Sequence, residues 1–199
     1  MRPRKAPEPQ DPARVGEAAL HEAALTHLAR YAATEAGLRR VLDRRIDRWA
    51  RTQEGAAGSE TVAETVAAAR AAARAVVARL AAARALNDAE FATARARSLA
   101  RAGRSRQAIA AHLAAKGVAR ETARAALPAD PAAELVAALV LARRRRLGPF
   151  RSSEPDAATR RKELGMLARA GFAQAVAAQA LGYDRGEAEA LIAQARDGA

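Results

Sequence analysis

Apolar residues recur along this 199-residue chain at steps of three and four, which is the spacing of one face of an α-helix. Leu20, Leu25 and Leu28 predict a helix over about residues 15–30. A second stripe follows Thr34, a candidate N-cap, and contains Leu38, Val41, Leu42, Ile46 and Trp49. Because no segment alternates apolar and polar residues as a strand does, the pattern predicts an all-α fold.

Polar caps and breaks at glycine or proline divide the rest of the chain into further helices. A long Ala-rich stripe follows a break at residues 55–59 and is expected to extend to about Leu86, and the helix after it should end at Gly103. The candidate N-caps are Ser59 or Thr61, Asn87 or Asp88, Ser105 and Asp130. Later helices are expected at 105–116, 120–127, 130–147, 157–170, 173–181 and 184–196, with a loop at 148–156.

A tetrad that begins with leucine occurs three times, as Leu28-Ala-Arg30-Tyr31, Leu99-Ala-Arg101-Ala102 and Leu167-Ala-Arg169-Ala170. In each copy another leucine follows 14 residues after the first, at Leu42, Leu113 and Leu181. Ten residues after the first leucine stand Leu38, Ile109 and Ala177, and the last two copies share a glycine, at 103 and 171. This spacing predicts three copies of one helix–turn–helix core, in which the later pair of residues faces inward.

The composition is rich in alanine and arginine. Lys and Arg number 34 against 22 Asp and Glu, which leaves a net charge of +12. Such a chain is attracted to nucleic acid, to an anionic membrane surface or to an acidic protein groove, and charge alone does not choose among them. A GC-rich genome also produces this composition, so the positions of the residues must carry the interpretation.

Nothing in the sequence predicts an enzyme. There are no cysteines, and His21, His27 and His112 are too scattered for a metal site, so no metal or cofactor is expected. Most carboxylates, such as those of Glu35, Glu60, Asp88, Asp130 and Asp156, stand at expected helix starts, where capping explains them. The chain carries no phosphate-binding glycine loop and no Ser-His-Asp arrangement.

The sequence also predicts a cytoplasmic location. No apolar run approaches the roughly 20 residues that a membrane span requires. The amino terminus is basic, but it is broken by prolines and lacks the apolar stretch of a secretion signal.

Residues 86–127 resemble the central part of the RecX family of RecA regulators. They contain an acidic turn before Phe91-Ala92, an Arg95-x-Arg97 pair, the Gly103 break and the series Ile109, Leu113, Lys116-Gly117. The run Arg161-Lys162…Met166-Leu167-Ala168-Arg169-Ala170-Gly171-Phe172…Val176…Leu181 is similar to the family's last repeat. With the weaker first repeat, the resemblance spans about residues 20–195. Ala94 departs from the pattern, since an aromatic residue is common there, and the third helix of the first repeat is unusually long.

The resemblance implies an elongated, curved array of three tandem three-helix repeats. We expect a disordered Pro-rich tail at 1–14 and repeats at 15–86, 87–128 and 129–199. It also implies a protein that inserts into the groove of a RecA–DNA filament and inhibits its recombinase and coprotease activities, with effects on DNA repair and the SOS response. RecA is therefore the expected partner, and direct contact with DNA is a further possibility. We expect the protein to be a monomer.

Several basic residues are candidates for partner or nucleic-acid binding. Arg97, Arg101 and Arg104 share one face if their helix includes all three. The four arginines at 143–146 end a helix, where they either bind a partner or favour the negative helix terminus. The full candidate set is Arg95, Arg97, Arg101, Arg104, Lys116, Arg143, Arg144, Arg145 and Arg146, with Arg70 and Arg74 as a weaker patch. A solvated basic face remains the alternative for each.

The aromatic residues Trp49, Phe91, Phe172 and Tyr183 are expected to be packing anchors rather than base-stacking groups, because each lies beside an apolar stripe. Two other functional classes remain open. One is a helix-turn-helix DNA-binding protein that acts without RecA, and the other is an Ala-rich structural or membrane-surface helix protein.

Overall fold

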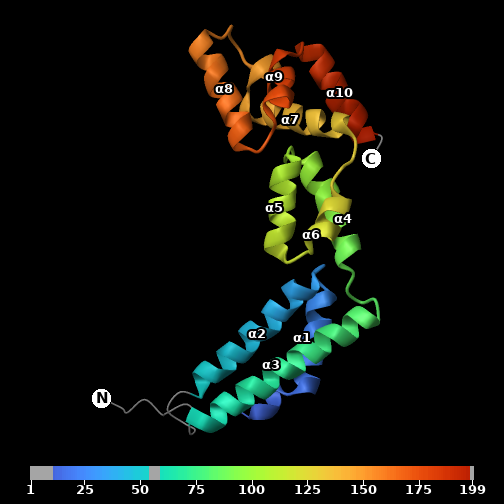
Figure 1. Ribbon diagram of the computed structural model, residues 1–199, viewed down its shortest axis with the longest axis vertical. Helices are drawn as coiled ribbons and strands as arrows, with labels where there is room; N and C mark the ends of the chain where they lie inside the picture. The colour runs from blue at the N-terminus through green and yellow to red at the C-terminus, as the bar shows by residue number, and fades with distance from the viewer. Residues whose placement is uncertain (1–10, 54–58, 198–199) are drawn as a thin grey trace, which may run out of the picture. The chain divides into compact units, whose positions relative to one another are not determined.

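The computed structural model describes residues 11–53 and 59–197. The elements in chain order are a 3₁₀ turn at Pro12–Val15, α1 (Glu17–Leu28), α2 (Glu35–Thr52), α3 (Ser59–Ala82), α4 (Asp88–Arg101), α5 (Arg106–Lys116), α6 (Arg120–Ala126), α7 (Pro131–Arg145), a 3₁₀ turn at Gly148–Phe150, α8 (Ala157–Arg169), α9 (Gln174–Gly182) and α10 (Arg185–Asp197) (Figure 1). These ranges contain helices and turns but no strand, so the prediction of an all-α fold is confirmed.

Two segments expected to be irregular are partly helical. Residues 12–14 of the expected disordered tail, together with Val15, form a 3₁₀ turn whose Val15 is buried in the core at 1% exposure. Gly148–Phe150 forms another within the expected loop, where Phe150 is buried. In both turns the burial of one apolar side chain anchors a short stretch of backbone. Residues 1–10 and most of the expected break at 55–59 lie outside the described residues.

Side-chain caps begin several of the helices at the predicted places. Thr34 and Ser105 accept hydrogen bonds from the backbone N–H groups of Gly37 (2.9 Å) and Ala108 (3.2 Å). Asp130 and Asp156 likewise accept from Ala132 (2.8 Å) and Thr159 (2.7 Å). Each cap satisfies one of the amides that a helix start leaves without an intrahelical partner.

Asn87 and Asp88, which were alternative caps of one helix, serve two different helices. Asn87 Oδ1 accepts from the N–H groups of Ala89 and Glu90, both at 3.1 Å, and so caps α4. Asp88 Oδ1 accepts from the N–H of Glu35 at 2.9 Å, at the start of α2. A carboxylate at this position also favours the positive end of the α2 dipole.

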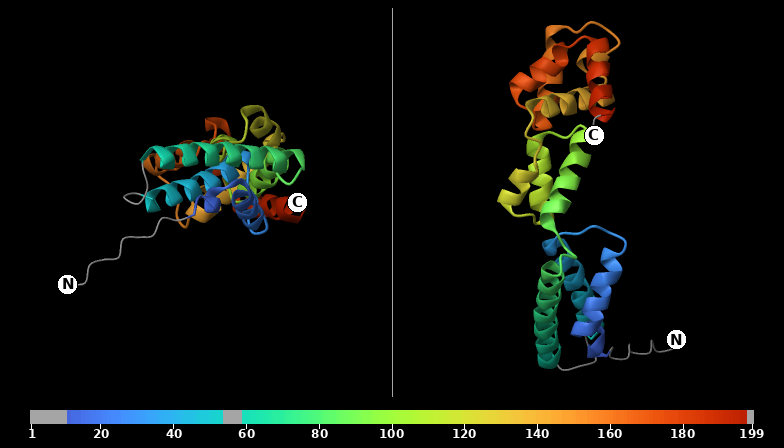
Figure 2. Two further views of the ribbon diagram at one scale, coloured as in Figure 1. Left: turned by 90° about the horizontal axis from the view of Figure 1, so that it is seen from below. Right: turned by 90° about the vertical axis from the view of Figure 1, so that its right-hand side faces the viewer.

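The chain divides into two compact units, Met1–Phe91 and Ala92–Ala199. In the first, α3 packs along both α1 and α2, as the two views of Figure 2 show. The buried side chains of its core include Leu20, Leu38, Leu42, Ile46, Trp49, Ala69, Ala73, Val76 and Leu80. The alanines on α3 let this long helix approach its neighbours closely without bulky side chains.

The second unit contains most of α4 and all of α5–α10. Helix α7 precedes the third tetrad and packs against α9 and α10. The four helices that the sequence predicts after residue 129 are α7, α8, α9 and α10. Ala137, Ala138 and Ala142 on α7 are at most 1% exposed, and their small side chains allow this close packing. Among the described residues no single helix has the length and apolarity to cross a membrane, and only the bent pair Arg120–Ala126 with Pro131–Phe150 passes together, on length and composition.

The repeated residues occupy matching places in the structure. The first leucines of the tetrads lie on α1, α4 and α8, and the later residues of each copy lie on α2, α5 and α9. Leu38, Leu42, Ile109, Leu113 and Ala177 are at most 1% exposed, while Leu181 is half-buried. The inward direction predicted from the spacing is therefore confirmed for five of these six positions.

Gly103 and Gly171, the glycines shared by the last two copies, have left-handed backbones with φ of +79° and +88°. A Cβ atom on Gly103 would lie 3.0 Å from the backbone nitrogen of Leu141 and 3.1 Å from the carbonyl oxygen of Ala137, both in α7. A Cβ atom on Gly171 would lie 2.6 Å from Ser105 Oγ. The left-handed conformation therefore favours glycine at both turns, and the space around each leaves little room for a Cβ atom.

We predict that Gly103→Ala lowers the free energy of unfolding by roughly 2 kcal/mol, because alanine pays the left-handed penalty and also meets the α7 backbone. Chemical denaturation followed by circular dichroism measures the change. Gly182→Ala is the matched control, since no atom lies within 4 Å of its Cβ position. Equal stability of the two variants would contradict the close approach of Gly103 to α7.

Candidate functional site

The turn between α4 and α5 is joined by hydrogen bonds to α7 and to the end of α8. Arg144 Nη1 donates to the carbonyl oxygen of Ala102 at 3.0 Å. Ser105 Oγ donates to the carbonyl oxygen of Ala170 at 2.6 Å while it also caps α5. Together with the close approach of Gly103 to α7, these bonds hold three chain segments at one junction.

A half-buried carboxylate braces the same junction from α7. The backbone N–H of Arg106 donates to both carboxylate oxygens of Glu134, at 3.0 and 3.2 Å. The Arg106 guanidinium also donates to the carbonyl oxygen of Pro128. Burial raises the pKa of Glu134, and the hydrogen bond and positive charge of Arg106 partly oppose this shift. Arg106 at the start of α5 is thereby joined both to the α6–α7 connection, at Pro128, and to α7, at Glu134.

The chain that leaves α7 is fixed by a buried ion pair. Glu163 on α8 is 5% exposed, and its Oε2 lies 2.6 Å from Arg151 Nη2. The same oxygen accepts the backbone N–H of Gly148 at 3.3 Å. The pair holds residues 148–151 against α8.

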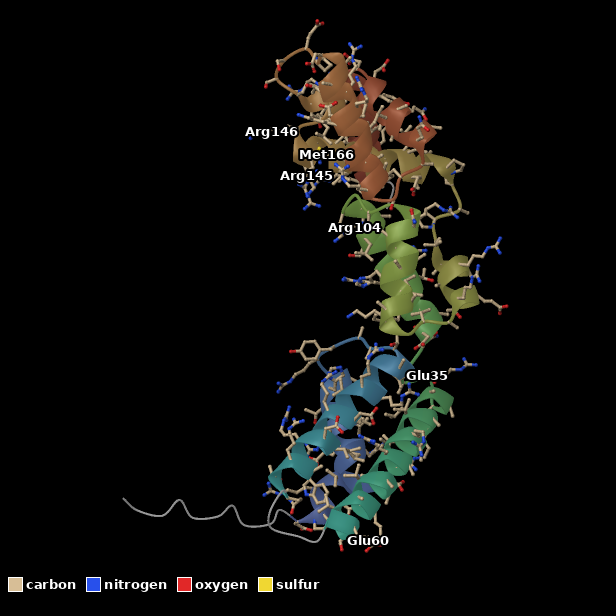
Figure 3. All side chains as sticks on the ribbon, turned by 60° about the vertical axis from the view of Figure 1, so that its left-hand side comes forward. Glu35, Glu60, Arg104, Arg145, Arg146 and Met166 are labelled. Carbon is tan, nitrogen blue, oxygen red and sulfur yellow. The ribbon has the colours of Figure 1, made fainter. Side chains whose placement is uncertain are left out.

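An open cleft of about 510 Å³ lies at this junction. Its lining consists of Ala102, Gly103, Arg104, Leu141, Arg144, Arg145, Leu147, Met166, Arg169 and Ala170. Four of these residues are arginines and none is acidic. Arg104, Arg145 and Met166 are labelled in Figure 3, where they lie on one side of the second unit. We call this feature the arginine cleft.

The four arginines come from three separate places in the chain. Arg104 follows the left-handed turn at Gly103, Arg144 and Arg145 belong to the last turn of α7, and Arg169 is the last residue of α8. Arginines at the carboxyl ends of helices oppose the negative end of the helix dipole, which favours their presence there without a partner molecule. Within the described parts of the chain, none of the four forms a salt bridge with a carboxylate.

Such an arrangement can bind an anion. Guanidinium groups donate paired hydrogen bonds to carboxylates and phosphates, and several of them around one hollow raise the local positive potential. Leu141, Leu147 and Met166 add apolar contacts beside the charges. The arginine cleft therefore suits an acidic protein surface or a phosphodiester backbone better than a neutral small molecule.

The structure separates the arginines at 143–146 by role. Arg144 and Arg145 line the cleft, whereas Arg143 Nη1 lies 3.0 Å from Glu189 Oε2 and pairs α7 with α10. Arg146 has a left-handed backbone, with φ of 57°, and forms the C-cap of α7. The helix-ending interpretation applies to Arg146, while Arg144 and Arg145 remain the candidates for binding.

Arg97, Arg101 and Arg104 were expected to share one face only if a single helix included all three, and this condition is not met. Helix α4 ends at Arg101, and the left-handed Gly103 then redirects the chain. Arg104 consequently lines the cleft, while Arg97 and Arg101 are exposed on α4 and do not line it. Chain direction after a helix end, rather than helical periodicity, decides where Arg104 lies.

Arg95 and Lys116 lie near His112 rather than in the cleft. Arg95 Nε donates to His112 Nε2 at 3.1 Å, a contact that requires a neutral imidazole. Burial lowers the pKa of His112, and the positive charges of Arg95, Lys116 and Arg104 lower it further. Arg95, Lys116 and Arg104 thus place positive charge around His112, between α4 and α5.

Arg169 is a cleft residue that the sequence did not single out. It is the arginine of the third Leu-Ala-Arg tetrad and corresponds to Arg30 and Arg101 in the other copies. The repeat itself was therefore the signal in the sequence that could have identified Arg169.

The weaker candidate patch of Arg70 and Arg74 lies beside carboxylates. Arg70 pairs with Asp47 at 2.9 Å, and the hollow that both arginines line also contains Asp43.

Trp49 and Phe172 are buried and Phe91 and Tyr183 are half-buried, which agrees with packing. No group of three His, Asp or Glu side chains within the described ranges is arranged to hold a metal ion.

Fold and cleft together define an all-helical repeat protein with a cationic cleft. Residues 87–127 match the family description "RecX, second three-helix domain". The chain is 39% identical over 172 residues to "Regulatory protein RecX" of Myxococcus xanthus, an alignment that covers 85% of this chain and 87% of that protein. It therefore belongs to the RecX family, as its motifs predicted.

Two other relatives agree. "Regulatory protein RecX" of Agrobacterium fabrum is 41% identical over 112 residues, which cover 56% of this chain and 60% of that protein. The crystal structure of RecX from Lactobacillus salivarius has a similar fold, with a TM-score of 0.56 at 16% sequence identity, and the match covers 83% of this chain and 94% of that one. The array of helical repeats is thus a fold that this chain shares with a solved member of its family.

We predict that His112 makes stability depend on pH. Because its pKa is lower in the folded state than the ordinary 6.5, the unfolded chain binds the proton more tightly, so stability is lost as the pH falls through 6.5. Denaturation at a series of pH values should show a smaller loss for His112→Gln than for the wild type. The same pH dependence in both proteins would exclude this role.

Proposed function

We propose that this protein binds the RecA nucleoprotein filament through the arginine cleft and restrains the filament's recombinase and coprotease activities. The observation that carries the proposal is the convergence of Arg104, Arg144, Arg145 and Arg169 on one open hollow without a carboxylate. A filament of protein and DNA presents both acidic side chains and phosphates, and each of these pairs well with guanidinium groups. Membership of a family whose relatives are named regulatory proteins supports this role.

The bonds around the junction support a preorganised site. Ser105, Glu134 and Arg144 hold the turn that carries Arg104 against α7 and the end of α8. A surface that is already ordered loses less conformational entropy when it binds. On this proposal the protein acts as a monomeric regulator in the cytoplasm, with no catalytic group of its own, and it lodges in the filament groove.

We predict that the double variant Arg145→Ala, Arg169→Ala needs roughly tenfold more protein for half-inhibition of RecA ATPase, because two charge-assisted contacts are lost. DNA-dependent ATP hydrolysis by RecA measures the effect. Arg160→Ala is the control, because Arg160 is an exposed arginine on α8 that does not line the cleft. Thermal unfolding should be nearly the same for all the proteins, since the substituted side chains are exposed.

Two results would reject the proposal. One is unchanged RecA ATPase and strand exchange at several-fold excess of the wild-type protein. The other is full inhibition by the double variant, which would remove the cleft from the interaction. A sequence-selective footprint on duplex DNA without RecA would instead support the helix-turn-helix alternative.

A further inference from the structure

A second hollow, of about 520 Å³, lies in the first unit between α1 and α2. Ala19 and Ala23 line it on the α1 side, where their small side chains leave space between the helices. Its charged and aromatic lining includes Glu22, Arg30, Tyr31, Arg44, Arg45 and Arg48. We call this feature the α1–α2 groove.

The α1–α2 groove is strongly cationic. Arg30, Arg44, Arg45 and Arg48 are all exposed, and Glu22 is the acidic residue in the lining. Among residues 11–53 and 59–197, none of these four arginines forms a salt bridge. Arg44 and Arg48 are four residues apart on α2, so their side chains start about 5–6 Å from each other. They form a row of positive charge along one wall.

Tyr31 gives this groove a feature that the arginine cleft lacks. Its side chain is 61% exposed, and its ring lies 5.3 Å from the ring of His27. The equivalent residues of the other two tetrads are Ala102 and Ala170, so the repeat does not need an aromatic side chain at this position. An exposed phenol ring next to a row of arginines offers both a stacking surface and charge.

We propose that the α1–α2 groove binds single-stranded nucleic acid, with phosphates on the arginines of α2 and an unpaired base stacked on Tyr31. Combining a basic groove with an aromatic platform is how proteins hold single strands without sequence preference. A duplex hides the faces of its bases, and an acidic polypeptide has carboxylates but no planar base. This binding requires no RecA and involves a different unit from the arginine cleft, so it goes beyond the function proposed above.

The first test uses the full-length protein and a short fluorescent oligothymidylate, followed by anisotropy in the absence of RecA. Tyr31→Ala should weaken binding roughly tenfold, because one stacked base is lost. Tyr31→Phe keeps the ring and should bind like the wild type. All variants are also measured with Arg145→Ala and Arg169→Ala present, so that the arginine cleft does not mask the result.

The second test concerns the charges on α2. Arg48→Ala should weaken oligothymidylate binding and reduce the slope of log affinity against log salt by about 0.7, the value for one phosphate contact on a single strand. Arg39→Ala removes the same charge from the same helix, but Arg39 lines a different hollow with Asp43 and Asp47, so it should have little effect.

Wild-type affinity in both Tyr31→Ala and Arg48→Ala would overturn the proposal. Two other outcomes would do the same, namely equally tight, Tyr31-independent binding to a blunt duplex of the same length, and competition by polyglutamate as strong as that by unlabelled oligothymidylate. RecA is absent from these assays, so their failure leaves the proposed regulation of RecA untouched, and failure of the RecA assay leaves this groove untouched.

Discussion

The close approach of Gly103 to α7 is the constraint on which the second unit depends. Gly103 has a left-handed backbone, and a Cβ atom on it would lie 3.0 Å from the Leu141 nitrogen. The next residue, Arg104, lines the same cleft as Arg144 and Arg145 of α7. A hydrogen bond from Arg144 joins the turn to α7, and one from Ser105 joins it to the end of α8.

Alanine makes such close approaches possible elsewhere in the chain. Ala137, Ala138 and Ala142 let α7 pack tightly, and Ala69 and Ala73 do the same for α3. Helices with thin apolar faces leave few core positions for large side chains, yet alanine has the highest helix propensity and loses no side-chain entropy. The low content of large apolar residues therefore coexists with an ordered fold.

The arginine cleft and the α1–α2 groove each contain the arginine of a Leu-Ala-Arg tetrad. Arg30 and Arg169 are equivalent residues of the first and third tetrads, and each lines the hollow of its own unit. In each case the arginine stands at the end of the first helix of a copy, where the chain turns. The neighbouring residues then differ, since Tyr31 is exposed and aromatic whereas Ala170 accepts the hydrogen bond of Ser105. The repeated arginine therefore stands beside an exposed aromatic ring in the first unit and beside a hydrogen-bonded backbone carbonyl in the second.

The sequence by itself determined the helices, most of their caps, the glycine turns and the family, because these depend on residues close together in the chain. Thr34, Ser105 and Gly103 act where local rules predicted them. Only the tertiary structure decided which charges meet. It placed Arg169 and Arg145 in one cleft, paired Arg143 with Glu189 and brought the Asp88 carboxylate to the Glu35 N–H at the start of α2. These contacts join residues far apart in the sequence, so they follow from how the helices pack, which helical periodicity and composition do not specify.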